Sequence, residues 1–267
     1  MGNNMSIPFA PHDLKPLQEI CNLPTDSWYA VFYLVSKGEH DNEKYEKTFT
    51  SAEGGSVWTY ASALSYDWKQ RGVTTGVYGA TTANDGKSAW GDAESMFKRF
   101  HELGGPDFSQ LASKAHTDKK VADELCKKIQ HLDGKAYEWY IQAQLEALCR
   151  KGGYIYESVH ALESCGIERT PLAIACVFDT ALNFGLGGKY CPVSWLKKHG
   201  RKDEQKDGEE VLLQFLKFKA LVGSKNNHNS CRNNAVNRAN MFVKLVRKKD
   251  WLLSRKGCEA VVTWTMK

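Results

Sequence analysis

Most of the chain repeats apolar residues every three to four positions, the spacing that predicts amphipathic helices. The clearest case is Asp92–Leu103, where Met96, Phe97 and Phe100 fall on one helical face. Comparable patterns predict helices at 14–22, 27–37, 118–132, 136–150, 155–165, 171–184, 208–222 and 234–254. The hydrophobic pattern therefore indicates a mainly helical protein.

An early stretch of the chain breaks this pattern. Residues 73–78 contain valine, threonine and tyrosine interrupted by glycine, which predicts a short strand. Before it, the polar run Asp41–Ala52 predicts a helix that ends at Gly54 and Gly55. We therefore expect a small antiparallel β-sheet, extending to about Thr82, beside the end of that helix.

Composition and length fit a globular protein in one domain. The chain has 267 residues, of which 42% are hydrophobic and 25% charged. We expect two lobes, the smaller at about 54–105 and the larger in the remainder, with an N-terminal extension at 1–25. The charged segment Lys197–Glu210 predicts a surface loop. No run of about 18 apolar residues occurs, so we expect a soluble protein without a transmembrane helix.

The N-terminus leaves the cellular compartment open. Met1–Pro11 lacks the basic start and apolar core of a secretory signal, although a mature secreted form would look the same. The residues Met1, Gly2 and Ser6 fit the Met-Gly-x-x-x-Ser pattern for N-myristoylation at Gly2. Both a cytoplasmic and a secreted protein are compatible with this sequence.

The cysteines indicate buried thiols. Four of the eight lie among apolar residues of predicted helices, namely Cys126, Cys149, Cys165 and Cys176. No Cys-x-x-Cys pair occurs, so the spacing does not favour a zinc site, and we expect neither a metal nor a cofactor. A disulfide stays open for a secreted protein and would involve the remaining candidates Cys191, Cys231 or Cys258.

Two carboxylates flank the start of the predicted sheet. Glu53 lies at the end of the predicted helix and Asp67 lies between it and the strand. Lysozyme-like enzymes place two carboxyls across a glycosidic bond in this order, one protonated to donate to the leaving oxygen and one ionised. A glutamate before two glycines is equally typical of a solvated helix end, so the spacing alone leaves both interpretations open.

The residues around these carboxylates resemble the family 46 glycoside hydrolases, which are chitosanases of the lysozyme-like superfamily. Ser51-Ala52-Glu53 is similar to a serine-alanine-glutamate triplet of the family. Residues 71–79 are similar to its arginine-glycine-aromatic-threonine-glycine-glycine-hydrophobic-hydrophobic-glycine stretch. The resemblance covers residues 51–100 and 155–252 with gaps. It implies a mainly α (α+β), two-lobed lysozyme-like fold. It also implies an endo-acting enzyme that hydrolyses β-1,4 bonds of chitosan, or of a related polysaccharide containing glucosamine, with inversion.

The resemblance also implies catalytic roles. Glu53 would be the general acid, and Thr74 matches a threonine that positions the attacking water. The position of the family's general base carries Lys69 here. Asp67, two residues earlier, is therefore the provisional base, with Asp85 as the alternative.

Sugar-binding residues are expected around the same segment. Arg71 and Gly79 belong to the matched stretch, and Asp92 matches an aspartate that contacts the sugar amine, although it also suits a helix cap. Aromatic rings can stack on pyranose faces or fill the core, and five lie near the expected cleft: Trp58, Tyr60, Trp68, Tyr78 and Trp90. Among these, Trp90 is the expected substrate contact.

Asp179 requires a buried cation as its partner. It lies in an otherwise apolar predicted helix, and burying an acid without a partner is costly. Residues 177–185 resemble a family helix whose aspartate pairs with arginines beneath the catalytic glutamate. The matching positions carry Lys219, a point charge rather than a fork, and Asn240, with Arg238 two residues away. We therefore expect Asp179, Lys219 and Arg238 to support Glu53.

The net charge of +5 leaves two further functions open. Chitosan is a polycation, whereas peptidoglycan is a polyanion that suits a basic protein better. The first alternative is therefore a muramidase of the lysozyme type acting on deacetylated peptidoglycan. The second, suggested by Lys69, is a catalytically silent carbohydrate-binding protein. The basic C-terminal residues predict the solvated face of a helix, so we expect a monomer that binds polysaccharide and no nucleic acid.

Overall fold

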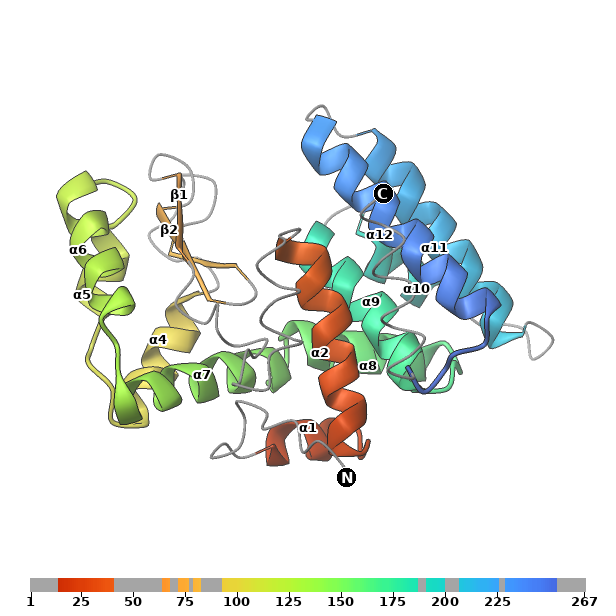
Figure 1. Ribbon diagram of the computed structural model, residues 1–267, viewed down its shortest axis with the longest axis horizontal. Coiled ribbons are helices and arrows are strands. Elements are labelled where there is room, and N and C mark those ends of the chain that lie inside the picture. The colour runs from red at the N-terminus through yellow and green to blue at the C-terminus, as the bar shows by residue number, and fades with distance from the viewer. Residues whose placement is uncertain are drawn as a thin grey trace, which may run out of the picture. The chain divides into compact units, whose positions relative to one another are not determined.

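The computed structural model describes residues 14–40, 64–67, 72–76, 79–82, 93–186, 191–199, 207–225 and 229–253. These residues form helices and a small antiparallel sheet, which follows the first two helices in the sequence (Figure 1). They divide into two compact units, the first comprising Met1–Pro16 and Asn42–Arg150, and the second Leu17–Asp41 and Lys151–Lys267. The prediction of a mainly helical protein with an early sheet is confirmed.

The sheet belongs to the first unit. Its strands β1 (Leu64–Asp67), β2 (Gly72–Thr75) and β3 (Ala80–Thr81) are antiparallel and adjacent in that order. Beyond the end of β3, the N–H of Val73 donates to Thr82 Oγ1 at 2.9 Å, and the N–H of Thr82 donates to the Val73 carbonyl at 3.0 Å. The pairing of β2 therefore continues to residue 82, where we expected the β region to end.

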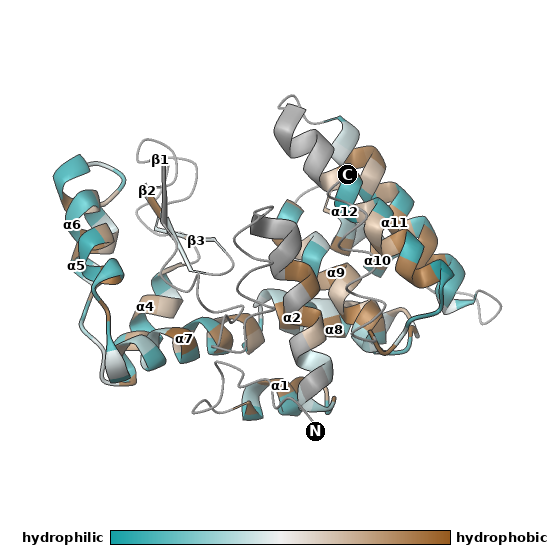
Figure 2. Ribbon diagram, in the orientation of Figure 1, coloured by the Kyte–Doolittle hydropathy of each residue, from teal (hydrophilic) through white to brown (hydrophobic). Residues whose placement is uncertain are grey.

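The helices of the first unit surround a core of aromatic rings. They are α4 (Ala93–Glu102), α5 (Ser109–Lys114), α6 (Lys119–Gln130) and α7 (Gly134–Cys149). Helix α4 packs on α7 and α5, α5 packs on α6, and α6 packs on β2. Four buried rings meet with centroids 5.3 to 6.3 Å apart: Phe97, Phe100, Phe108 and Tyr140. Many residues of α5 and α6 are hydrophilic (Figure 2). Helix α7 packs on α4, and this unit extends to Arg150. The lobes expected at about 54–105 and in the remainder stay a prediction.

Helix α9 is the centre of the second unit. The elements of this unit are most of α1 (Lys15–Ile20), α2 (Thr25–His40), α8 (Tyr154–Ser164), α9 (Pro171–Phe184), α10 (Pro192–His199), α11 (Gly208–Ser224) and α12 (Asn229–Arg247). Helix α9 contacts α2, α8, α10, α11 and α12, and its residues 171–181 are all buried. A helix that is apolar on every side is stable only when other elements cover every side.

Local signals define the ends of α9. Thr170 Oγ1 accepts from the Ala173 N–H at 3.2 Å, and Pro171 occupies the first turn. At the other end, Gly185 has φ +74°, a left-handed conformation that favours glycine. Both ends agree with the helix that the sequence predicts.

Other boundaries differ from the prediction. Helix α10 includes Lys197–His199, which we expected to lie in a surface loop. This part of the prediction is wrong because Val193 and Leu196 of the same short helix are buried and anchor it. Helix α12 runs over Asn229–Arg247 rather than 234–254, and just beyond it Lys249 has φ +56°. The helix predicted at Asp41–Ala52 and the myristoylation pattern at Gly2 lie outside the described residues.

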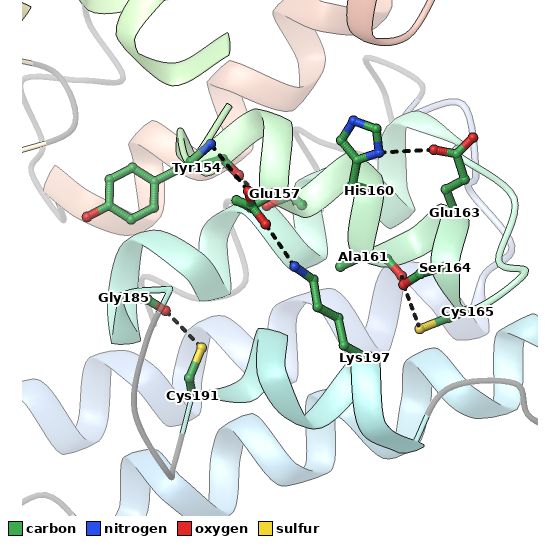
Figure 3. A network of polar contacts seen from close by, with 12 residues as sticks. Tyr154, Glu157, His160, Ala161, Glu163, Ser164, Cys165, Gly185, Cys191 and Lys197 are labelled. Atoms are coloured by element: carbon green, nitrogen blue, oxygen red, sulfur yellow. Dashed lines mark hydrogen bonds and ion pairs between the residues drawn. The ribbon is translucent and has the colours of Figure 1, made fainter. Parts of the chain in front are cut away.

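The cysteines that the structure describes are thiols. Those without a disulfide are Cys21, Cys126, Cys149, Cys165, Cys176 and Cys191. Cys191 Sγ donates to the Gly185 carbonyl at 3.1 Å and Cys165 Sγ to the Leu196 carbonyl at 3.0 Å (Figure 3 shows the first contact). The prediction of thiols is therefore confirmed for Cys126, Cys149, Cys165 and Cys176, of which Cys126 is only partly buried. Among the disulfide candidates, Cys191 is a thiol, while Cys258 and the side chain of Cys231 lie outside the described residues. Among the residues that the structure describes, no helix is both long enough and apolar enough to cross a membrane.

Helices α11 and α12 approach each other closely at Gly223. A Cβ atom added there would lie 2.6 Å from the Ala235 Cβ, closer than two carbon atoms can pack. We predict that Gly223→Ala destabilises the protein by about 1–3 kcal/mol, the usual cost of overpacking, although alanine favours helix. Urea unfolding of the two proteins measures the difference.

Gly208→Ala is the matched control, since its added Cβ would meet Ile167 Cγ2 at an ordinary 3.7 Å. This variant should unfold at the same or a higher urea concentration than the wild type. Equal unfolding midpoints for Gly223→Ala and the wild type would contradict the close approach of the two helices.

Candidate active site

Thr74 occupies the centre of the sheet. It is half-buried, whereas its neighbours Val73 and Thr75 are buried on either side of it. Successive residues of a strand point to opposite faces of the sheet. Thr74 therefore faces away from the core in which Val73 and Thr75 are packed.

The strand register places position 67 on the face of Thr74. Ser65 is the partner of Thr74 in the β1–β2 pair, and Asp67 stands two residues further along β1, opposite Gly72. Positions two apart in a strand share a face and lie about 7 Å apart. The sheet thus brings the backbone position of the provisional base to the face that carries the expected water-binding threonine.

The turn after β2 brings Gly79 next to the same threonine. Gly76 and Gly79 have φ of +83° and +66°, and the N–H of Gly79 donates to the Gly76 carbonyl at 3.3 Å. A Cβ atom on Gly79 would lie 3.5 Å from Thr74 Cγ2. Glycine at both positions permits the left-handed turn that folds the chain back beside Thr74.

Asp179 is the centre of a buried ionic network in the second unit. Arg238 Nε donates to Asp179 Oδ1 at 2.9 Å, Arg238 Nη2 donates to the same oxygen, and Lys219 Nζ donates to Oδ2. The side chains of Asp179 and Lys219 have no exposed surface, and that of Arg238 is 5% exposed. Lys219 Nζ also lies 5.6 Å from the ring centroid of Phe242, a cation–π contact.

Electrostatics keeps the Asp179 carboxylate ionised. Burial by itself would raise the pKa of Asp179, but the attraction of Arg238 and Lys219 outweighs it and the pKa is lowered. The pKa of Lys219 is lowered, chiefly by burial. The attraction of Asp179 raises this pKa, and the repulsion of Arg238 lowers it further. The structure therefore brings together the three residues of the expected supporting network, one each from α9, α11 and α12.

Several of the expected site residues lie outside the described residues. These are Glu53, Arg71, Trp90 and Asp92, together with Lys69 and the alternative base Asp85. For Asp67 the structure describes the backbone position in β1, and its side chain lies outside the description. Their roles rest on the sequence resemblance.

Two residues of α7 contact the sheet and were missed by the sequence analysis. Tyr140 OH and Thr75 Oγ1 form a hydrogen bond of 2.8 Å, and the side chain of Gln144 lies against Gly76. Both residues are buried and one helical turn apart. Polar residues on a helical face that is otherwise apolar were the available signal.

A second polar cluster connects α8 and α10 (Figure 3). Lys197 Nζ donates to Glu157 Oε2 at 2.8 Å, the Gly152 N–H donates to Glu157 Oε1 at 3.2 Å, and the pKa of Glu157 is lowered, chiefly by Lys197. Such exposed pairs contribute little to stability, and this one joins the first turn of α8 to the last turn of α10. Among the described residues, no group of three or more His, Cys, Asp or Glu side chains could hold a metal ion.

Chitosanases are among the solved structures whose fold is similar to that of this chain. A chitosanase of glycoside hydrolase family 46 from Gynuella sunshinyii, in complex with chitotetraose, is 14% identical with a TM-score of 0.62, covering 87% of this chain and 93% of that one. A native chitosanase from Bacillus subtilis is 18% identical with a TM-score of 0.58 and the same coverage. A mutant of the Bacillus subtilis enzyme in complex with six GlcN gives the same values. The sequence matches no family model and no curated protein.

The chain therefore has the fold of the family 46 chitosanases, and the predicted lysozyme-like fold class is confirmed. At sequence identities of 13–18%, this likeness shows the path of the backbone. It does not show which side chains are catalytic.

Lys219 stabilises the protein through Asp179. We predict that Lys219→Met lowers the free energy of unfolding by about 3 kcal/mol, the lower end of the range for breaking a buried ion pair, because Arg238 still contacts the carboxylate. Lys217→Met, an exposed position on the same helix, is the control and should change the unfolding free energy by less than about 0.5 kcal/mol. Similar losses in both variants would contradict the role of the network.

The pKa of Asp179 predicts how this stabilisation depends on pH. A carboxyl whose folded pKa is below its unfolded value of about 4 stabilises the fold fully above that value. The contribution falls as the pH drops below about 4 and is lost at the folded pKa. We predict that the difference in unfolding free energy between wild type and Asp179→Asn is constant from about pH 7 to 5 and shrinks below about 4. A difference that grows on acidification would contradict this assignment.

Proposed function

We propose that this protein is an endo-acting glycoside hydrolase that cleaves β-1,4 bonds of chitosan, or of a related polymer containing glucosamine, with inversion. The observation that carries the proposal is the likeness of 87% of the chain to chitosanases solved in complex with chitotetraose and with six GlcN. The sequence motif around Glu53 supports it independently, because the motif consists of side chains whereas the likeness concerns the path of the backbone.

The proposed mechanism uses two carboxyls on opposite sides of the scissile bond. Glu53 donates a proton to the glycosidic oxygen as it leaves, and Asp67 accepts a proton from a water that attacks the anomeric carbon from the other side. Thr74 holds this water. Inversion requires about 6.5–9.5 Å between the two carboxyls, so that the water fits between base and sugar. The shared face of positions 67 and 74 supports the pairing of base and water.

The remaining expected residues bind the sugar. Asp92 would pair with the ammonium group of a glucosamine unit, and Trp90 would stack on a pyranose face. Arg71 would donate to hydroxyl groups. Gly79 lacks a side chain beside Thr74, which leaves room for a sugar ring close to the backbone.

The buried network has a supporting role in this proposal. Lys219 of α11 and Arg238 of α12 both form ion pairs with Asp179 of α9 in the second unit. In the family resemblance, such a network supports the catalytic acid, and this is the role that we propose for it here. Lysine at position 219 contributes a point charge in place of a planar fork.

Glu53→Gln and Asp67→Asn test the proposed acid and base. We predict that each variant lowers the rate of release of reducing ends from soluble chitosan by about 10²–10⁴-fold, the usual contribution of general acid–base catalysis. Glu94→Gln, on the exposed face of α4, is the matched control and should retain wild-type activity. Circular dichroism of every variant verifies folding.

The other outcomes identify the alternatives. Full activity in Asp67→Asn, with loss in Asp85→Asn, would move the role of base to Asp85. Activity of the wild type on deacetylated peptidoglycan but not on chitosan would establish a muramidase, which the net charge of +5 favours. A folded wild-type protein that binds chitosan oligomers without cleaving them would overturn the enzyme and support the binding protein.

A further inference from the structure

Tyr140 and Thr75 form a buried contact between helix α7 and strand β2. Their hydroxyl oxygens are 2.8 Å apart, and the two residues are 0% and 1% exposed. They are separated by 65 residues in the sequence. Burial raises the pKa of Tyr140, so the phenol is neutral and can take part in a hydroxyl–hydroxyl hydrogen bond. Leaving either hydroxyl unpaired in such a place is unfavourable, so the bond holds β2 against α7.

Gln144 extends this contact to the next residue of the chain. It lies one turn after Tyr140, its Nε2 donates to the Tyr140 carbonyl at 3.3 Å, and its side-chain amide lies against Gly76. A Cβ atom on Gly76 would collide with Gln144 Oε1, and the φ of +83° at Gly76 also favours glycine. Helix α7 therefore contacts two consecutive residues, Thr75 and Gly76.

Thr74 is held from both sides. After it come Thr75 and Gly76, which α7 contacts, and before it comes Val73, which is bonded to Thr82 by both its N–H and its carbonyl. Because the pleat alternates, the inward anchoring of Val73 and Thr75 turns Thr74 to the opposite face. A slide or rotation of β2 relative to α7 would displace the hydroxyl of Thr74.

We propose that Tyr140 is a positioning residue for catalysis, which acts through its bond to Thr75 and orients Thr74 toward the attacking water. Gln144 assists by holding Gly76. The inference rests on the proposed function, in which Thr74 binds that water. Tyr140 itself touches neither the sugar nor the reacting atoms.

The double variant Tyr140→Phe/Thr75→Val separates positioning from stability. It removes both hydroxyls and leaves no buried polar atom unpaired, so its unfolding midpoint should stay close to that of the wild type. We expect kcat on soluble chitosan to fall about 10- to 100-fold, the effect of small misplacements in catalysis, while KM stays within about twofold because sugar contacts remain. Thr75→Ser retains the hydroxyl and should recover most of the kcat lost in Thr75→Val. Tyr156→Phe, on α8 of the second unit, is the control for loss of a phenol hydroxyl.

The results distinguish this inference from the proposed function. Wild-type kcat in a stable double variant would overturn the positioning role and leave the proposed hydrolase intact. A fall in kcat in the double variant that equals the fall in Tyr156→Phe would also overturn it. A folded wild-type protein without activity on chitosan or peptidoglycan would overturn the proposed function, and the positioning role with it.

Discussion

The charge of Asp179 is the constraint on which the second unit depends. Helix α9 is covered by helices on every side, so an ionised carboxylate there has no access to water. It is compatible with the fold only because Lys219 and Arg238, 40 and 59 residues away in sequence, reach it from α11 and α12. One charged group thereby connects three helices through buried ionic contacts.

Most of the fold follows from the sequence pattern, and the departures have local causes. Helix α9 was predicted with its correct ends because threonine, proline and glycine mark them. The last turn of α10, Lys197–His199, was assigned to a loop because its residues are charged and the buried residues of this short helix are few. The end of α12 was missed because Lys249, rather than a glycine, takes up the left-handed conformation that follows it.

The candidate site was predictable where a single residue requires a particular kind of partner. Asp179 had to find a buried cation because its neighbours in the sequence are apolar, and the resemblance to chitosanases indicated where the cations would come from. The bond between Tyr140 and Thr75 could not be predicted in this way, because a polar residue on an apolar helical face does not indicate its partner, and the two residues meet only after the chain has folded. In the first unit this contact orients the sheet, as Asp179 organises the helices of the second. Each unit thus contains a buried polar interaction between distant parts of the sequence.

The central claim is inverting hydrolysis of a glucosamine polymer, and the configuration of the first product tests it most directly. Proton NMR of a short β-1,4 glucosamine oligomer, recorded in real time with the wild-type protein, distinguishes the anomers before they equilibrate. We predict that the α-anomer of the new reducing end appears first, because a water activated by a base on the far side inverts the centre. Initial appearance of the β-anomer, or no cleavage by the folded protein, would contradict the account.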